Sequence, residues 1–160
     1  MSIKAVSIEG IKAFQSLDAI QRESLAKVMS RRVYALGDSI INQTTDTCDV
    51  YFLISGRVRV CTYSKNGKEI QFEDLESGEM FGELAALDGD TRTSECVALS
   101  ESIVAVMSQT DFLVTIDTHT GVNRYVITRL VQMLRNHMGR VIEFSTHSVK
   151  DRLRLSLIHI

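Results

Sequence analysis

The stretch from Phe81 to Leu99 reads FGELAALDGDTRTSECVAL and places one carboxylate, Glu83, nine residues before one arginine, Arg92. A short helix that begins near Gly82 would direct free backbone N–H groups outward at its N-terminus, which suits an anion. Glu83 would accept hydrogen bonds from sugar hydroxyls, and the planar guanidinium of Arg92 matches two oxygens of a phosphate. With Thr93 as a further hydroxyl donor, these groups suit a small ligand that carries both a phosphate and a hydroxylated sugar.

The same residues also fit purely structural roles. Glu83 suits the first turn of a helix, where a carboxylate interacts favourably with the helix dipole. Arg92 could equally be a surface residue that pairs with Asp88 or Asp90. From spacing and residue type alone, we rank these structural roles ahead of ligand binding.

The residues on both sides of this stretch predict mainly strands. From Arg32 to Met107, short runs rich in β-branched and aromatic residues alternate with glycines, as in VYFLISGRVRV. Such runs predict an antiparallel β-roll or sandwich. The pair Asn66-Gly67 predicts a hairpin turn, because both residue types tolerate a positive φ. Residues 9–30 predict two short helices, and residues 108–116 predict another.

The C-terminal part of the chain predicts a long helix over residues 120–146, apolar on two faces. One face carries Val126, Leu130, Met133, His137, Val141 and Phe144, and the other carries Val122, Tyr125, Val131, Leu134, Met138 and Ile142. We predict that one face covers the roll and the other pairs with a second copy of the chain. The alternative is a core helix of a single domain. Ser148 and Asp151 fit a capping box, which predicts that a new helix begins at Val149.

The composition is that of an ordinary globular protein, with 44% hydrophobic and 24% charged residues. No apolar run approaches the roughly 18 residues that span a bilayer. The first residues lack the apolar core of a signal peptide, so we expect a cytoplasmic protein. Basic residues are concentrated late: residues 122–154 carry seven basic and two acidic side chains, whereas residues 1–121 carry 11 and 18. We interpret the basic segment as a solvated helix face.

Several motifs, in this order, resemble the cyclic nucleotide-binding domain. FGELAAL followed by DGDTRTSECVAL is similar to the phosphate-binding cassette of that family, FGE(L)A(L), a variable loop and then R-(S/T/A)-A-x-V-x-A. YALGDSII, VYFLISGRVRV and SKNGKEI resemble the strands and hairpin that precede the cassette. The resemblance implies a mainly β fold with flanking helices: a double-stranded β-helix or jelly-roll-like antiparallel roll, followed by a long C-terminal dimerisation helix.

This resemblance implies a role for each cassette residue. Glu83 would bind the 2′-hydroxyl of the ribose, and Arg92 would pair with the cyclic phosphate, to which Thr93 would also donate its hydroxyl. The cradle would be completed by backbone amides around Gly82, Leu84 and Ala85. The implied effector is cyclic AMP, with cyclic GMP as the alternative, because a threonine at position 93 fits either purine. No metal and no other cofactor is implied.

The long helix followed by DRLRLSL is similar, more narrowly, to the Crp/Fnr (catabolite activator) family of bacterial transcription regulators. In the catabolite activators a Thr-Ser pair on this helix reaches the purine. The aligned residues here are His137 and Met138, with Asn136 adjacent, which leaves the choice of base open.

The implied domains are a cyclic nucleotide-binding roll with N-terminal helices at residues 1–118, a dimerisation helix at 119–147, and a hinge that starts a helix-turn-helix domain at 148–160. That DNA-binding domain is expected to lie outside this chain. We therefore predict the sensing domain of a transcription regulator that forms a homodimer through residues 120–146.

Two alternatives remain open at this point. The first is a regulatory cyclic nucleotide-binding module of a kinase, a channel or a stand-alone signalling protein. The second, from another class, is a cupin-like metal enzyme, which needs histidines on its strands. We disfavour this second alternative and expect no enzyme, because residues 1–118 contain no histidine and no nucleophile–base pair is visible.

Overall fold

A computed structural model describes the backbone of residues 6–158. The chain divides into two compact units, with the boundary in the sequence between Asn123 and Arg124. In the described residues, the first unit contains the β-roll, one 3-10 helix and three α-helices, and the second consists of the greater part of a long helix. No helix within residues 6–158 is long and apolar enough to cross a membrane.

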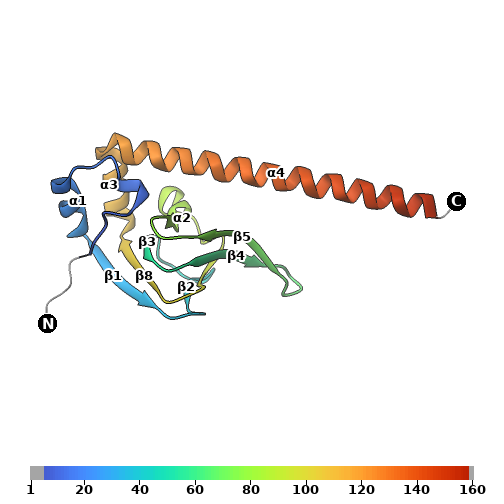
Figure 1. Ribbon diagram of the computed structural model, residues 1–160, viewed down its shortest axis with the longest axis horizontal. Helices are drawn as coiled ribbons and strands as arrows, with labels where there is room; N and C mark the ends of the chain where they lie inside the picture. The colour runs from blue at the N-terminus through green and yellow to red at the C-terminus, as the bar shows by residue number, and fades with distance from the viewer. Residues whose placement is uncertain (1–5, 159–160) are drawn as a thin grey trace. The chain divides into compact units, whose positions relative to one another are not determined.

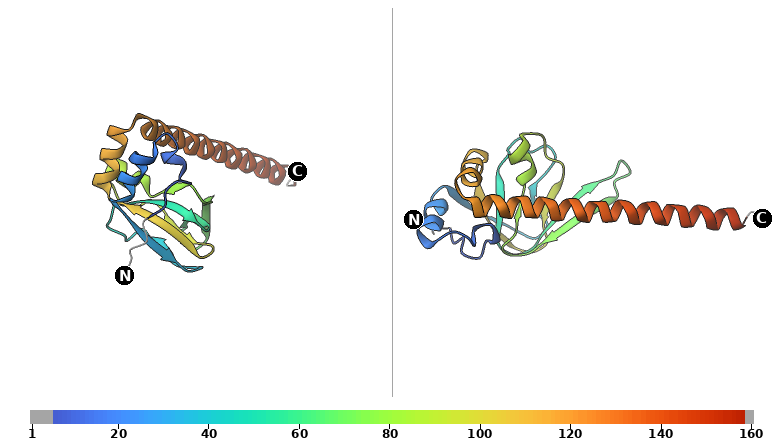
Figure 2. Two further views of the ribbon diagram at one scale, coloured as in Figure 1. Left: turned by 60° about the vertical axis from the view of Figure 1, so that its left-hand side comes forward. Right: turned by 90° about the horizontal axis from the view of Figure 1, so that it is seen from above.

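Eight strands of the first unit form two four-stranded antiparallel sheets, as the sequence predicts (Figure 1). The strands are β1 (Met29–Tyr34), β2 (Ser39–Ile41), β3 (Val50–Ser55), β4 (Val58–Tyr63), β5 (Glu69–Leu75), β6 (Met80–Phe81), β7 (Glu95–Ala98) and β8 (Ser102–Met107). One sheet has the order β1-β8-β3-β6 and the other the order β2-β7-β4-β5. Figure 2 shows the strands of the roll from two further directions. The main hydrophobic core contains residues of both sheets, so it lies between them.

Strand β3 is buried on both faces because a different part of the first unit packs against each face. Tyr51 and Leu53 belong to the core between the sheets. Successive side chains of a strand point to opposite faces, so Phe52 faces the other way. There it contacts Phe14, with the ring centroids 4.8 Å apart. The continuous apolar run of this strand therefore joins the roll to the N-terminal segment.

The flanking helices of the first unit also agree with the prediction from sequence. A short 3-10 helix, η1 (Lys12–Phe14), precedes α1 (Ala19–Ala26), and α3 (Gln109–Thr118) follows the last strand. Asp18 caps α1, since its carboxylate accepts a 2.8 Å hydrogen bond from the backbone N–H of Gln21. Ser108 caps α3 in the same way through the N–H of Asp111 at 3.2 Å.

The predicted hairpin at Asn66-Gly67 joins β4 to β5. Only the glycine of this pair has a positive φ, of 75°. Across the two strands that this turn connects, Arg59 of β4 and Asp74 of β5 form a bidentate ion pair. Nε donates to Oδ1 at 2.8 Å, and Nη2 donates to Oδ2 at 3.0 Å. This hydrogen-bonded guanidinium holds the pKa of Asp74 below its usual value.

The second unit is a single helix and corrects one prediction. Helix α4 (Thr120–Ile158) continues without interruption through Ser148, so the predicted helix start at Val149 is wrong. A capping-box sequence marks a helix start only where the preceding chain leaves the helix. Here Thr146 still donates its hydroxyl to the carbonyl of Ile142 at 2.9 Å, one helical turn earlier. The functional division at residues 118 and 147 stays a prediction, and residues 159–160 lie outside the described part.

The ion pair between Arg59 and Asp74 predicts a pH-dependent effect of Asp74→Asn. A lowered carboxyl pKa stabilises the fold above the unfolded-state pKa of about 3.9, and this stabilisation is lost as the pH falls through the folded-state pKa. We expect Asp74→Asn to unfold at a lower temperature than the wild type at pH 7. The difference between the two unfolding temperatures, which we call the gap, should narrow below about pH 4.

Thermal unfolding followed by circular dichroism between pH 3 and pH 7 measures this gap. The control is Asp46→Asn, an exposed aspartate in the loop before β3, which should show little difference at any pH. A gap for Asp74→Asn that stays constant over the whole pH range would contradict the assignment.

Candidate functional site

The site begins where β6 ends and the chain turns into a short helix. Gly82 follows Phe81 with φ +80° and is the N-cap of α2 (Glu83–Asp88), as the sequence predicts. A Cβ at Gly82 would lie 3.0 Å from Nη1 of Arg92 and 3.1 Å from the carbonyl oxygen of Asp49. Glycine is therefore required here both for the left-handed conformation and for the close approach of the arginine.

Arg92 is fixed against the start of α2 by two backbone carbonyls. Its side chain comes from the loop after α2, and the residue is only 7% exposed. Nη1 donates to the carbonyl of Gly82 and Nη2 to the carbonyl of Asp49, both at 2.9 Å. The guanidinium therefore joins the start of α2 and the loop after α2 to the loop before β3, which is 43 residues away in the sequence.

One donor of this guanidinium is buried without an acceptor. Nε of Arg92 has no hydrogen-bond partner among the described residues. A buried donor that is left unsatisfied costs about 1–3 kcal/mol, and more for a charged group. A bound anion would supply the acceptor that Nε lacks, and its negative charge would add to the two neutral carbonyls that hold Arg92.

Glu83 belongs to the helix end that this guanidinium contacts. It is the first residue of α2 and is 3% exposed, although glutamate is rarely buried this deeply. Because Arg92 bonds to the carbonyl of Gly82, the residue immediately before Glu83, the fold brings the two predicted residues to the same helix end. A carboxylate at this end is favoured by the helix dipole.

The other predicted cassette residues lie on α2 and in the loop after it. Ala85 is 4% exposed and packs inside the first unit, whereas Leu84 is 37% exposed on the same helix. Thr93 follows Arg92 and is exposed, so its hydroxyl is accessible to a ligand. The first N–H groups of a helix have no partner within the helix, which leaves the amides at the start of α2 able to donate.

The three residues predicted to reach a purine lie on α4 in the second unit. Asn136, His137 and Met138 are all exposed. The amide oxygen of Asn136 accepts a 3.1 Å hydrogen bond from Nε2 of Gln132. Their contact with a base stays a prediction.

Two contributors to the site were missed by reasoning from the sequence. Asp49 acts through its backbone carbonyl, which every residue type provides, so no sequence signal marks it. Tyr51 stacks on Phe81, the residue before the N-cap, with centroids 5.2 Å apart and 16° between the rings. Burial raises the pKa of the Tyr51 hydroxyl, while the positive charges of Arg32 and Arg92 oppose that rise. Since β3 pairs with β6 through these two residues, the strand pairing would have revealed this contact.

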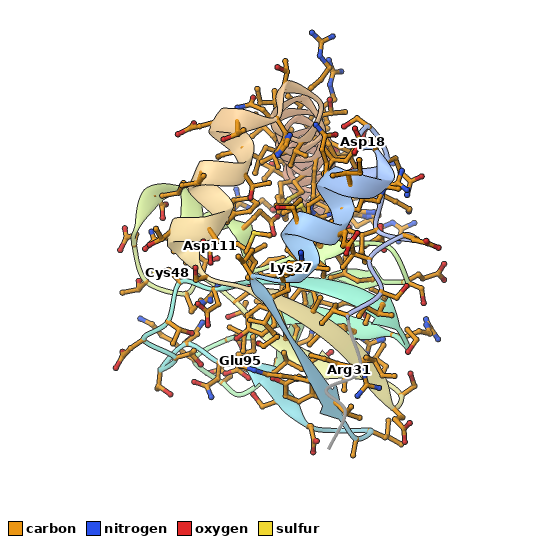
Figure 3. All side chains as sticks on the ribbon, turned by 90° about the vertical axis from the view of Figure 1, so that its left-hand side faces the viewer. Asp18, Lys27, Arg31, Cys48, Glu95 and Asp111 are labelled. Carbon is orange, nitrogen blue, oxygen red and sulfur yellow. The ribbon has the colours of Figure 1, made fainter. Side chains whose placement is uncertain are left out.

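The titratable and thiol side chains near the site are dispersed. Within residues 6–158 no three His, Cys, Asp or Glu side chains come together in an arrangement that could hold a metal ion. The three cysteines are free thiols, and Cys61 and Cys96 are buried, whereas Cys48 is half-buried in the loop before Asp49 (Figure 3). The donor set of the site, one guanidinium and one carboxylate beside helix amides, suits an organic anion with hydroxyl groups.

Comparison with known proteins points to the same kind of ligand as these donor groups. Residues 31–119, more than half of the chain, match the profile of the family described as cyclic nucleotide-binding domain. The protein belongs to this family, and its structural neighbours include Crp/Fnr-type regulators.

Two relatives illustrate the similarity in sequence. The cAMP-dependent protein kinase regulatory subunit of Debaryomyces hansenii is 32% identical over 105 residues, which cover 66% of this chain and 22% of that protein. The cyclic AMP receptor protein of Thermus thermophilus is 24% identical over 153 residues, which cover 96% of this chain and 71% of that protein. The chain thus spans about a fifth of the kinase regulatory subunit and most of the receptor protein.

Solved structures extend the comparison. The catabolite activator protein of Thermus thermophilus superimposes with a TM-score of 0.74 at 26% identity, over 83% of this chain and 62% of that one. The sensor domain of the transcriptional regulator DNR from Pseudomonas aeruginosa superimposes with a TM-score of 0.69 at 19% identity, over 81% and 87% of the two chains, which shows a shared fold.

The crowding at Gly82 predicts that Gly82→Ala is more damaging than Gly89→Ala at the other end of α2. Both glycines have positive φ, so both variants carry left-handed strain of about 1–2 kcal/mol. Only at Gly82 would the new methyl group crowd Arg92 and the carbonyl of Asp49, whereas at Gly89 the nearest atom is 3.9 Å away. We expect Gly82→Ala to lower the free energy of unfolding by at least about 1 kcal/mol more.

Chemical denaturation measures the two free energies of unfolding. In parallel, NMR follows the Nε–H resonance of Arg92, which should shift in Gly82→Ala and stay in place in Gly89→Ala. Equal losses of stability with an unmoved resonance would show that the close approach at Gly82 is incorrect.

Proposed function

We propose that this protein senses a cyclic purine nucleotide, and that the ligand binds where Arg92 meets the start of α2. The observation that carries the proposal is the buried Nε of Arg92, which has no acceptor in the described part of the chain and lies by the N-terminus of a helix whose first residue is Glu83. Membership of the cyclic nucleotide-binding domain family supports it independently.

In this proposal each group at the site has one task. The cyclic phosphate accepts hydrogen bonds from Nε of Arg92, from the hydroxyl of Thr93 and from amides at the start of α2. Glu83 accepts a hydrogen bond from the ribose 2′-hydroxyl. Cyclic AMP is the proposed effector and cyclic GMP the alternative, with residues 136–138 as the proposed contact for the base. No group in the proposal activates water, so the nucleotide is an effector and not a substrate.

We further propose that the parent protein is a cytoplasmic transcription regulator of the Crp/Fnr type. The similarity over 153 residues to a cyclic AMP receptor protein, which includes most of α4, supports this role. In the proposal, two copies pair through residues 120–146, and the nucleotide biases the orientation of a DNA-binding domain outside residues 1–160. A ligand can do this only through different contacts in the two orientations.

A second candidate is a regulatory module of a kinase or of another signalling protein. It is favoured by the higher identity, 32%, to a kinase regulatory subunit. The two candidates differ in what α4 does, since the first requires this helix to pair with a second copy.

Nucleotide titration by calorimetry tests the site. We expect wild type to bind cyclic AMP or cyclic GMP, and Arg92→Ala to raise the Kd at least about thirtyfold, because truncating one partner of a buried charge pair costs roughly 2–5 kcal/mol. The matched control is Arg31→Ala, an exposed arginine of β1, which should leave the Kd unchanged. Circular dichroism checks that each variant is folded. Tight binding that survives Arg92→Ala in a folded protein would refute the assignment.

Sedimentation equilibrium tests the role of α4. We expect a dimer at micromolar concentration, and Leu134→Asp to shift it to monomer, because Leu134 is 60% exposed on the apolar face of the helix. The control Glu143→Gln, at an exposed polar position of α4, should remain a dimer. A wild-type chain that stays monomeric at high concentration would favour the second candidate.

A further inference from the structure

The inner face of the second sheet changes from apolar to polar along strand β4. The side chains of Val58, Val60 and Thr62 point to the same face of the sheet, because they occupy alternate positions of the strand. Val58 is fully buried in the core between the sheets, and Val60 is half-buried against that core. Thr62 is also half-buried, and its hydroxyl accepts a 3.1 Å hydrogen bond from Nε2 of Gln43 in the loop after β2. The far end of this face therefore offers polar groups.

Strand β5 places a carboxylate on the same inner face. Glu73 lies directly opposite Val60, and Leu75 lies directly opposite Val58. Residues that lie opposite each other in an antiparallel pair point to the same face of the sheet. Leu75 is fully buried in the core, whereas Glu73 is half-buried. The carboxylate of Glu73 therefore belongs to the inner face of the roll and lies at the edge of its core.

This carboxylate lies across the sheet from the residues of the candidate site. The strand order is β2-β7-β4-β5, and Cys96 of β7 pairs with Val60, which pairs in turn with Glu73. Neighbouring strands are about 4.8 Å apart, so roughly 10 Å separates the backbones at Cys96 and Glu73. Cys96 follows Arg92 by four residues. Figure 1 shows β4 and β5 side by side. A ligand that is anchored at Arg92 therefore reaches Glu73 by crossing β4.

The opposite direction along the sheet is closed by strand β2. Ile41 is 2% exposed, and its Cδ1 would lie 3.1 Å from a Cβ at Gly82. Ile41 therefore packs against the start of α2, and a ligand at Arg92 extends towards β4 and β5 instead. In a cyclic nucleotide the base and the phosphate lie at opposite ends of the ribose. With the phosphate at Arg92, the base lies over the inner face that carries Glu73.

A carboxylate distinguishes the two purines by the donors that they present. An ionised carboxylate has acceptors only. The Watson–Crick edge of guanine carries two adjacent donors, N1–H and N2–H, which match the two oxygens of a carboxylate. Adenine presents one donor there, N6–H, next to N1, whose lone pair faces the carboxylate without a proton between them. A site that leaves polar groups unmatched rejects the wrong ligand strongly.

We propose that Glu73 recognises the base of the bound nucleotide and selects guanine, with its carboxylate accepting hydrogen bonds from N1–H and N2–H. This selection rests on the proposed function, since it requires the phosphate to bind at Arg92. It favours cyclic GMP, the alternative effector, over cyclic AMP. It also gives the base a contact in the first unit, besides the contact proposed for residues 136–138.

Calorimetric titration of the full chain with cyclic AMP, cyclic GMP and cyclic IMP tests the selection. Hypoxanthine, the base of cyclic IMP, keeps the N1–H of guanine and lacks its N2 amino group, so the three nucleotides differ in the donors that meet Glu73. We expect wild type to bind cyclic GMP at least about tenfold more tightly than cyclic AMP, with cyclic IMP between the two. A wild type that binds cyclic AMP more tightly overturns the selection.

Glu73→Gln tests the carboxylate itself, because glutamine keeps the size of the side chain. The glutamine amide both donates and accepts, a pattern that pairs with adenine. We expect the ratio of the Kd values for cyclic AMP and cyclic GMP to fall at least about tenfold. The matched control is Glu101→Gln, an exposed glutamate in the loop before β8, which should leave this ratio unchanged. Circular dichroism checks that each variant is folded.

The remaining outcomes separate this selection from the proposed function. If Arg92→Ala weakens binding while Glu73→Gln leaves the ratio of Kd values unchanged, the selection is overturned and the proposed site stands. An equal loss of affinity for all three nucleotides in Glu73→Gln shows that Glu73 only supports the pocket, which also overturns the selection. A folded wild-type protein that binds none of the three nucleotides overturns the proposed function and the selection together.

Discussion

The buried guanidinium of Arg92 is the constraint on which the site depends. A cation that is removed from water is costly unless acceptors surround it, and here two backbone carbonyls, of Gly82 and Asp49, do so. These carbonyls belong to segments that meet only when the roll is complete. The loop after α2 therefore has a defined position only in the folded roll, and the buried donor Nε has no acceptor within residues 6–158.

The roll supports this arrangement through short strands and one aromatic pair. β6 contains only two residues, yet it determines where α2 begins, because Phe81 pairs with Tyr51 of the central strand β3 and stacks on it. The N-terminal segment reinforces the approach to β6, since the N–H of Lys12 donates to the carbonyl of Gly78 at 2.9 Å. Helix α3 holds the other end of α2 through Gln109, whose amide donates to the carbonyl of Ala86 at 3.1 Å.

Sequence reasoning predicted the elements, and it singled out the two charged residues that the structure buries, Glu83 and Arg92, because their signals are local. Glycine at position 82 and the hairpin at Gly67 mark backbone conformations that few residues adopt, and strand periodicity marks buried faces. The carbonyl of Asp49 was missed because main-chain atoms carry no residue-specific signal and the contact spans 43 positions. The capping box at Ser148 was misleading for the opposite reason: a local signal was present, but no glycine or proline lies between residues 140 and 158 to end the helix.

The main-chain nature of the acceptor at Asp49 has an evolutionary consequence. Any residue type at that position offers the same oxygen, so point substitutions there can change the side chain freely without removing the anchor of the guanidinium. Insertions and deletions in the loop before β3 have the opposite effect, because they shift the oxygen itself. Divergent members of the family should therefore vary in residue identity at this position while conserving the length of the loop that leads to it.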